Sequence, residues 1–227
     1  MARTVNPAAH SVRREAFIDA AQRLMQTKGY EQMSIQDLLD ELGASRGAFY
    51  HYFDSKQALL GAMVDRIADQ ALATVETVVA DPTLNAVEKL ERFFGGIASY
   101  KTERKALMLE FIKVWRSDFN TIVREKSRQA LVGRVAPMLA RIVRQGIAEE
   151  VFSVEWPDET ATLVLTLLLG FQDGATDLFV ARQENRVSYA EAERVLLSFA
   201  RAFERILGAA PGTIRIVDEN TLREWFG

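Results

Sequence analysis

Apolar residues recur at intervals of three and four along most of this 227-residue chain, and that spacing limits the fold to helices. The first stretch shows the pattern i, i+3, i+4, i+7 and i+8 of one helical face: Phe17, Ala20, Ala21, Leu24 and Met25. No segment alternates apolar and polar residues as a half-buried strand does, and no internal repeat occurs. The sequence predicts an all-α fold.

Caps and helix breakers divide the pattern into separate helices. Ser34 and Ser45 are expected as N-caps, because a serine hydroxyl accepts from an otherwise unpaired amide of the first turn. Gly43 is expected to end the second helix in a left-handed turn. The predicted helices cover residues 11–28, 34–42, 45–53, 55–80, 85–101, 103–116, 118–148 with a bend at Pro137, 157–183, 188–208 and, near the end, 219–226.

Composition argues against several kinds of protein. The chain has no cysteine and only two histidines, so thiolate sites are excluded and a histidine metal centre or other cofactor is not expected. The longest apolar segment, residues 161–171, is shorter than the roughly 18 residues of a membrane span. The N-terminus lacks the apolar core of a secretion signal, so we expect a cytoplasmic protein without membrane contact.

Charge is unevenly distributed around a net value of −3. The first 14 residues carry Arg3, Arg13 and Arg14 and no acid, whereas residues 148–227 hold seven basic and 14 acidic side chains. An acidic surface repels a polyanion, so any nucleic-acid contact is expected near the N-terminus.

Residues 34–53 have the pattern of a helix-turn-helix: helix, Gly-containing turn, short helix. Such a motif needs apolar inner faces on both helices and a small residue at the turn. The turn residue is Gly43, and the inner faces are supplied by Leu38, Leu39, Leu42, Phe49 and Phe53.

The outer face of the short helix then carries the candidate DNA-reading residues. Arg46 suits a bidentate contact to guanine in the major groove. Gly47 and Ala48 keep the helix thin enough to approach base edges, and Tyr50 and His51 can donate to phosphates.

Three further residues are candidate phosphate contacts. Ser34 and Ser45 stand at helix N-termini, where amides and hydroxyls hold anions. Lys56 lies in the first turn of the fourth helix, where the helix dipole favours acids, and a nearby phosphate would explain it. Each candidate also has an alternative without DNA. The two serines are helix caps, Lys56 can be a solvated lysine, Arg46 can form a surface salt bridge, and Tyr50 and His51 can pack on the body of the protein.

The run from Arg13 to Leu60, and above all its core G-A-S-R-G-A-F-Y-H-Y-F-D-S-K, resembles the N-terminal domain of the tetracycline-repressor-like (TetR) family of bacterial regulators. The resemblance implies a helix-turn-helix domain over residues 1–55 and a ligand-binding and dimerisation domain over residues 56–227. It implies a homodimer on a palindromic operator and a small-molecule inducer. Positions that commonly touch DNA in the family are Ser34, Ser45, Arg46, Ala48, Tyr50, His51 and Lys56. Ala48 departs from a frequent threonine, which removes a hydroxyl contact and favours contact with a thymine methyl.

The later part of the chain offers candidates for the other two functions. Aromatic residues and a methionine are candidate inducer contacts, with ordinary core packing as the alternative: Phe93, Met108, Phe111, Trp115 and Phe171. Gly170 and Gly174 permit close helix packing, so the two long helices within 157–208 are expected to form the homodimer interface as a four-helix arrangement, with ordinary helix packing within one chain as the alternative.

The leading hypothesis is therefore a sequence-specific transcription regulator, a repressor released by its inducer, with ligand-dependent activation as an alternative. The rival from another class is a di-iron enzyme, which needs Glu-x-x-His pairs that neither histidine has. No nucleophile elbow, P-loop or dinucleotide fingerprint occurs either, so no enzyme is expected. A third reading is a helical scaffold or small-molecule carrier without DNA binding.

Overall fold

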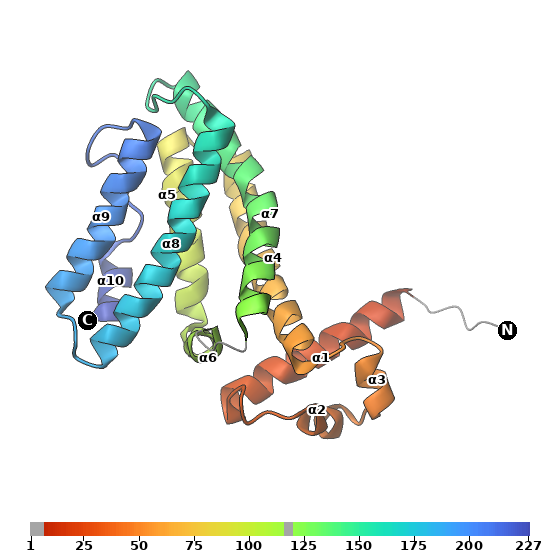
Figure 1. Ribbon diagram of the computed structural model, residues 1–227. Coiled ribbons are helices and arrows are strands. Elements are labelled where there is room, and N and C mark those ends of the chain that lie inside the picture. Colours follow the sequence, from red (N-terminus) through yellow and green to blue (C-terminus); the bar gives the residue numbers. More distant parts are fainter. Residues whose placement is uncertain (1–6, 116–119) are drawn as a thin grey trace. The chain divides into compact units, whose positions relative to one another are not determined.

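The computed structural model describes residues 7–115 and 120–227, and only the backbone of residues 7–9 and 115. Every regular element in these ranges is a helix, so the predicted all-α class is confirmed (Figure 1). The helices are α1 (Pro7–Lys28), α2 (Ile35–Leu42), α3 (Arg46–Tyr50), α4 (Lys56–Ala80), α5 (Ala86–Glu103), α6 (Lys105–Trp115), α7 (Thr121–Ala148), α8 (Pro157–Gln183), α9 (Tyr189–Leu207) and α10 (Glu219–Phe226).

Helix boundaries follow the predicted caps closely. Ser34, Ser45 and Ser188 each accept a hydrogen bond from a first-turn amide, as N-caps do. Gly43 and Gly208 end α2 and α9 with φ of 55° and 62°, a conformation that glycine adopts without strain. The first helix begins earlier than predicted, at Pro7, because proline is tolerated in a first turn.

Helix α7 continues through Pro137 without a break in the helical assignment. The bend predicted at this proline stays a prediction. The predicted start of the same helix, at residue 118, lies outside the described residues.

The chain packs as two compact units. The N-terminal unit comprises the described residues up to Ala68 together with Arg104–Arg128, and the larger unit comprises Asp69–Glu103 and Gln129–Gly227. The N-terminal unit thus extends beyond the segment 1–55 predicted as the DNA-binding domain, because the start of α4 and all of α6 pack with the first helices. The predicted functional boundary after residue 55 stays a prediction.

The core of the N-terminal unit is built from one face of each of its helices. Helices α1 to α3 bury large apolar side chains, among them Phe17, Leu38 and Phe49. Helix α6 packs against α1 and buries Leu107 and Val114. The first turns of α4 complete the core with buried leucines and a methionine: Leu59, Leu60 and Met63.

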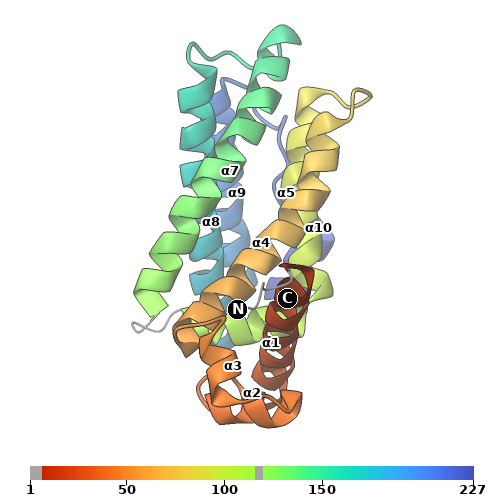
Figure 2. The same ribbon diagram turned by 90° about the vertical axis from the view of Figure 1, so that its right-hand side faces the viewer.

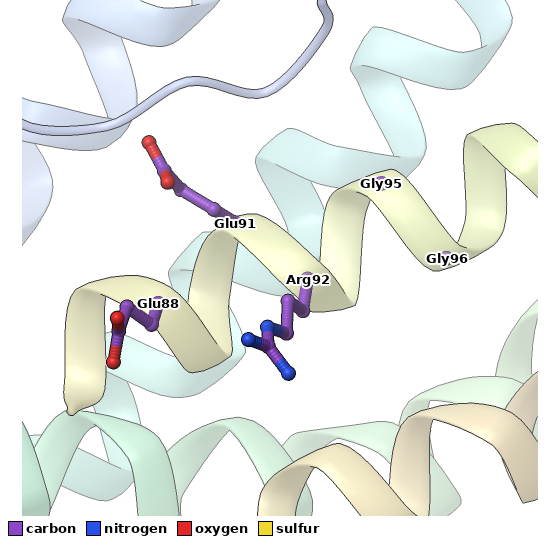
Figure 3. A pocket seen from close by; sticks show the side chains of 5 residues that line it. All are labelled: Glu88, Glu91, Arg92, Gly95 and Gly96. Atoms are coloured by element: carbon purple, nitrogen blue, oxygen red, sulfur yellow. The ribbon is translucent and has the colours of Figure 1, made fainter. Parts of the chain in front are cut away.

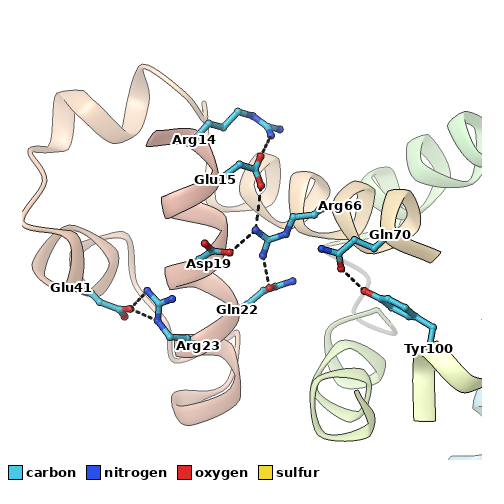
Figure 4. A network of polar contacts seen from close by, with 9 residues as sticks. All are labelled: Arg14, Glu15, Asp19, Gln22, Arg23, Glu41, Arg66, Gln70 and Tyr100. Atoms are coloured by element: carbon cyan, nitrogen blue, oxygen red, sulfur yellow. Dashed lines mark hydrogen bonds and ion pairs between the residues drawn. The ribbon is translucent and has the colours of Figure 1, made fainter. Parts of the chain in front are cut away.

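Ion pairs and a hydrogen bond from Arg66 connect α4 to α1 in this unit (Figure 4). Its guanidinium contacts the carboxylates of Glu15 at 3.2 Å and Asp19 at 2.6 Å, and it donates to the side-chain oxygen of Gln22. The beginning of α4 is therefore held by both apolar packing and charge.

The larger unit has a core shared by α4, α5, α7, α8 and α9. Helices α8 and α9 lie side by side (Figures 1 and 2). The predicted short terminal helix is present as α10, and it packs against α5, α8 and α9. Trp225 Nε1 donates to Thr102 Oγ1 at 2.9 Å, and Arg182 Nε donates to the Phe226 carbonyl at 2.9 Å. The tail is thus an integral part of this unit.

Helix α8 corrects the expectation that no segment is long and apolar enough to span a membrane. By length and composition Pro157–Gln183 passes that test, with a mean hydropathy of 1.4 over its most apolar window. Its glycines and threonines lower the mean hydropathy only a little, so counting uninterrupted apolar residues missed the helix. A single helix that passes this test by length and composition is weak evidence for a membrane.

Candidate nucleic-acid interface

A capping box fixes the start of α2. The Ser34 hydroxyl accepts from the Asp37 amide at 3.1 Å, and the Asp37 carboxylate accepts from the Ser34 amide at 2.8 Å. Lys28 donates to the same carboxylate at 2.6 Å. The hydrogen bond from Lys28, together with those from Ser34, lowers the pKa of Asp37 to about 2. The box therefore stays charged and intact at neutral pH.

The turn and the second cap set the direction of α3. After Gly43, the Ala44 amide donates to the Leu39 carbonyl at 2.9 Å and closes the end of α2. The Ser45 hydroxyl then accepts from the Ala48 amide at 3.2 Å. Two helices joined by a tight glycine turn, with α3 following α2 directly, make a helix-turn-helix.

Two phenylalanines anchor α3 from beneath. The helix ends at Tyr50, three residues earlier than the predicted end at Phe53, so Phe49 lies on it and Phe53 follows it. Phe49 and Phe53 are buried, and their rings lie 5.7 Å and 6.3 Å from the ring of Phe17 on α1. Edge-to-face aromatic pairs at such distances add to the stabilisation from burial. A helix of five residues has little stability of its own, so this anchor determines where α3 lies.

The opposite side of α3 faces solvent. Ser45, Arg46, Gly47 and His51 are exposed, Ala48 is half-buried, and Tyr50 is 43% exposed. The Arg46 guanidinium lies 5.9 Å from the centre of the Tyr50 ring. The structure therefore brings six of the eight predicted DNA-binding residues together around one short helix; their contact with DNA stays a prediction.

The other two predicted residues lie at the ends of neighbouring helices and have partners within the protein. The Ser34 side chain is exposed and belongs to the capping box. Lys56 Nζ donates to the Glu31 carbonyl at 3.3 Å and lies 4.2 Å from the centre of the Tyr30 ring. Partial burial lowers the pKa of Lys56. These contacts hold the Lys56 side chain against Tyr30 and Glu31, and its contact with a DNA phosphate stays a prediction.

Sequence reasoning missed an aromatic cluster behind the end of α3. The chain's two histidines face each other, with 5.2 Å between the ring centres of His10 and His51, and Tyr52 lies 4.6 Å from His10. This contact joins the N-terminal half of α1 to the end of α3. The residues are far apart in sequence, and no local pattern signals the pairing.

The predicted inducer contacts are not brought together in one described unit. Phe93 is fully buried and Phe171 half-buried in the larger unit. Met108 and Phe111 are buried in the N-terminal unit, and the side chain of Trp115 lies outside the described residues. Their role in ligand binding stays a prediction.

One hollow of the larger unit lies along α5 and is lined by different residues (Figure 3). It encloses about 450 Å³ and is open to solvent. Three charged residues and two glycines line it: Glu88, Glu91, Arg92, Gly95 and Gly96. A β-carbon added at either glycine would meet no atom within 4 Å, so both glycines border open space.

Comparison with known proteins agrees with this architecture. Residues 17–63 match the family described as bacterial regulatory proteins, tetR family, and residues 107–192 match the tetracyclin repressor-like C-terminal domain. The first match spans the helix-turn-helix, and the second runs from α6 into α9. The chain belongs to the TetR family.

Individual curated proteins match only part of the chain, at moderate identity. The chain is similar to the HTH-type transcriptional regulator EthR of Mycolicibacterium smegmatis, with 35% identity over 98 residues, 41% of this chain and 45% of the relative. It is similar to the HTH-type transcriptional repressor KstR2 of Rhodococcus jostii, with 27% identity over 125 residues, 51% and 61% of the two chains. The chain thus spans about half the length of the curated relatives it matches.

Solved structures show the same fold at low identity. A TetR transcription regulator from Haloarcula marismortui superposes with a TM-score of 0.62 at 21% identity, covering 87% of this chain and 97% of the other. At this identity the likeness concerns the fold alone.

Proposed function

We propose that this protein is a sequence-specific, DNA-binding transcription regulator that reads the major groove with α3. The observation that carries the proposal is the two-sided character of that helix. Phe49 buries one side of α3 in the core, helped by Phe53 just past the end of the helix, while Arg46 and Tyr50 are exposed on the other side. An arginine on a thin, exposed helix can donate two parallel hydrogen bonds to guanine.

The proposed assembly is a homodimer formed through α8 and α9. Both helices expose large apolar side chains, with Leu163 57% and Leu197 55% exposed. Only 17% of the most apolar window of α8 is buried within the chain, so a second copy can cover what remains. Two copies related by a two-fold axis would place their α3 helices on a palindromic operator.

The proposed regulation is repression that a small molecule relieves. The relative KstR2 is named as a transcriptional repressor, which favours repression over ligand-dependent activation. An inducer that binds the DNA-incompetent conformation better shifts the population away from DNA. Helix α4 is the natural connection, because its residues up to 68 belong to the N-terminal unit and its residues from 69 to the larger unit.

The same proposal makes the protein a cytoplasmic regulator without enzymatic activity or cofactor. Among the described residues no group of three or more histidine, cysteine or acidic side chains is arranged to hold a metal ion. The exposed outer face of α3 favours DNA binding over the alternative of a scaffold or carrier.

Selection of bound sequences from a random double-stranded DNA pool tests the function without knowledge of the operator. We expect enrichment of a palindrome whose half-sites are about one helical turn, roughly 10 base pairs, apart. A pool that shows no enrichment after repeated rounds would favour the carrier or scaffold reading. An enriched sequence without two-fold symmetry would contradict the proposed dimer.

A further inference from the structure

His51 stands where α3 ends, and its side chain is exposed. Its backbone is held in place, because its amide donates to the Gly47 carbonyl at 3.1 Å and closes the last turn of the helix. The side chain is a different matter, since an exposed side chain samples several rotamers unless its neighbours restrict it. A contact between His51 and a DNA phosphate therefore depends on what holds the imidazole ring.

Two neighbouring rings contact the imidazole of His51. The His10 ring lies 5.2 Å from it at an angle of 75°, and the Tyr52 ring lies 5.0 Å from it at 80°, so both contacts are edge-to-face. The rings of His10 and Tyr52 also contact each other, with 4.6 Å between their centres. Each ring thus touches the other two, and this mutual contact leaves His51 fewer positions than a solvated side chain has.

This ring cluster of His10, His51 and Tyr52 is packed on one side and open on the other. The Tyr52 ring lies 5.9 Å from the ring of Phe17, which is fully buried. His10 and Tyr52 are half-buried, whereas His51 is exposed. The cluster therefore rests on the core of the N-terminal unit and leaves one of its rings accessible to a ligand.

The same part of α1 has other attachments to the helix-turn-helix. Arg13 Nη2 donates to the Leu42 carbonyl at 3.5 Å, at the end of α2. The Arg14 guanidinium lies 5.4 Å from the centre of the Phe53 ring. Because these contacts also hold α1 against the motif, the position of α1 does not depend on the ring of His10 alone.

We propose that His10 is a positioning residue of the DNA interface, whose ring, with that of Tyr52, holds the His51 imidazole in place to donate to a DNA phosphate. The inference rests on the proposed function and adds to it a residue of α1 that lies outside the helix-turn-helix. Phosphate contacts determine the register and orientation of a protein on the duplex. A side chain that is ordered before binding spares the entropy otherwise lost on binding, which raises the affinity.

A double-mutant cycle on DNA affinity tests the proposal, with the operator obtained from the DNA selection and fluorescence anisotropy at one fixed salt concentration. The variants are His10→Ala, His51→Ala and the two combined, each checked by circular dichroism to be folded. We expect His10→Ala to bind about two- to tenfold more weakly, since ordering one side chain at an interface has a cost of that order. The combined variant should bind within about twofold of His51→Ala, because a positioning ring has no effect once the side chain that it positions is absent.

His10→Phe separates positioning from direct contact with DNA. Phenylalanine keeps a ring that can contact His51 and Tyr52, but it has no nitrogen that could donate to a phosphate. We expect this variant to bind within about twofold of the native protein. The control cycle pairs His10→Ala with Arg46→Ala, at the opposite end of α3, and there the two losses should add within about twofold.

The proposal is overturned if His10→Ala binds as the native protein does, or if it weakens binding equally with and without His51, as a purely structural role would. It is also overturned if His10→Phe binds as weakly as His10→Ala, because His10 would then contact DNA itself. Equal coupling in the control cycle would overturn it too, since the effect would not be specific to His51. In each of these cases the native protein still binds its selected operator, so the proposed function stands; a selection that yields no operator would contradict both.

Discussion

Removal of the Arg66 side-chain charge should destabilise the protein more than removal of an exposed arginine from the same unit. Arg66 is only 16% exposed, and it contacts two carboxylates and an amide on α1. A hydrogen bond to a charged group contributes about 1.5–3 kcal/mol when buried, and a solvent-exposed ion pair contributes about 0–1 kcal/mol. Glu15 and Asp19 are partly exposed, so we place each contact near 1 kcal/mol and expect Arg66→Met to cost about 2 kcal/mol.

The matched control is Arg23→Met, since Arg23 also pairs with a carboxylate, that of Glu41, but is 59% exposed. Its expected cost is about 0.5 kcal/mol. Urea unfolding followed by circular dichroism gives both free energies of unfolding. The reasoning is refuted if the two variants lose the same free energy of unfolding within error. Arg66 would then contribute no more than an exposed arginine does.

Three further variants test separate parts of the account. Lys56→Met should weaken binding to all DNA sequences and reduce the salt-dependence slope by about one unit; an unchanged slope would leave Lys56 with only its contacts to Tyr30 and Glu31. Leu163→Glu should shift the protein from dimer to monomer in sedimentation, whereas Val12→Glu, also at an exposed apolar site, should not; equal behaviour would argue against the α8 interface. Phe49→Ala should cost about 3–5 kcal/mol in urea unfolding, and a loss below about 1 kcal/mol would mean that Phe49 does not anchor α3.

The parts of the structure that depend on local chemistry could be predicted from the sequence. Ser34 and Ser45 were identified as caps because their hydroxyls bond amides within three residues. Gly43 was identified as the turn because it must adopt a positive φ. The burial of Phe49 and Phe53 agrees with their spacing, although only Phe49 lies on α3.

The parts that depend on distant neighbours could not be predicted. The carbonyl that receives the Lys56 ammonium belongs to Glu31, and Arg66 contacts residues more than 40 positions away. Lys101 on α5 donates to the side-chain oxygen of Gln172 on α8, 71 positions away, and no local pattern signals that contact. Phe93 and Met108 were both predicted to contact the inducer, and both are buried. They lie in different compact units, which no local sequence pattern indicates.

The claim that the exposed side of α3 reads bases is tested most directly by repeating the DNA selection with Arg46→Ala beside the native protein. We expect the variant to lose preference at one position in each half-site, with the remaining positions retained and affinity reduced by about 1–3 kcal/mol. The same consensus and the same affinity for both proteins would contradict the claim, because a side chain that contacts a base cannot be removed without relaxing the choice of that base.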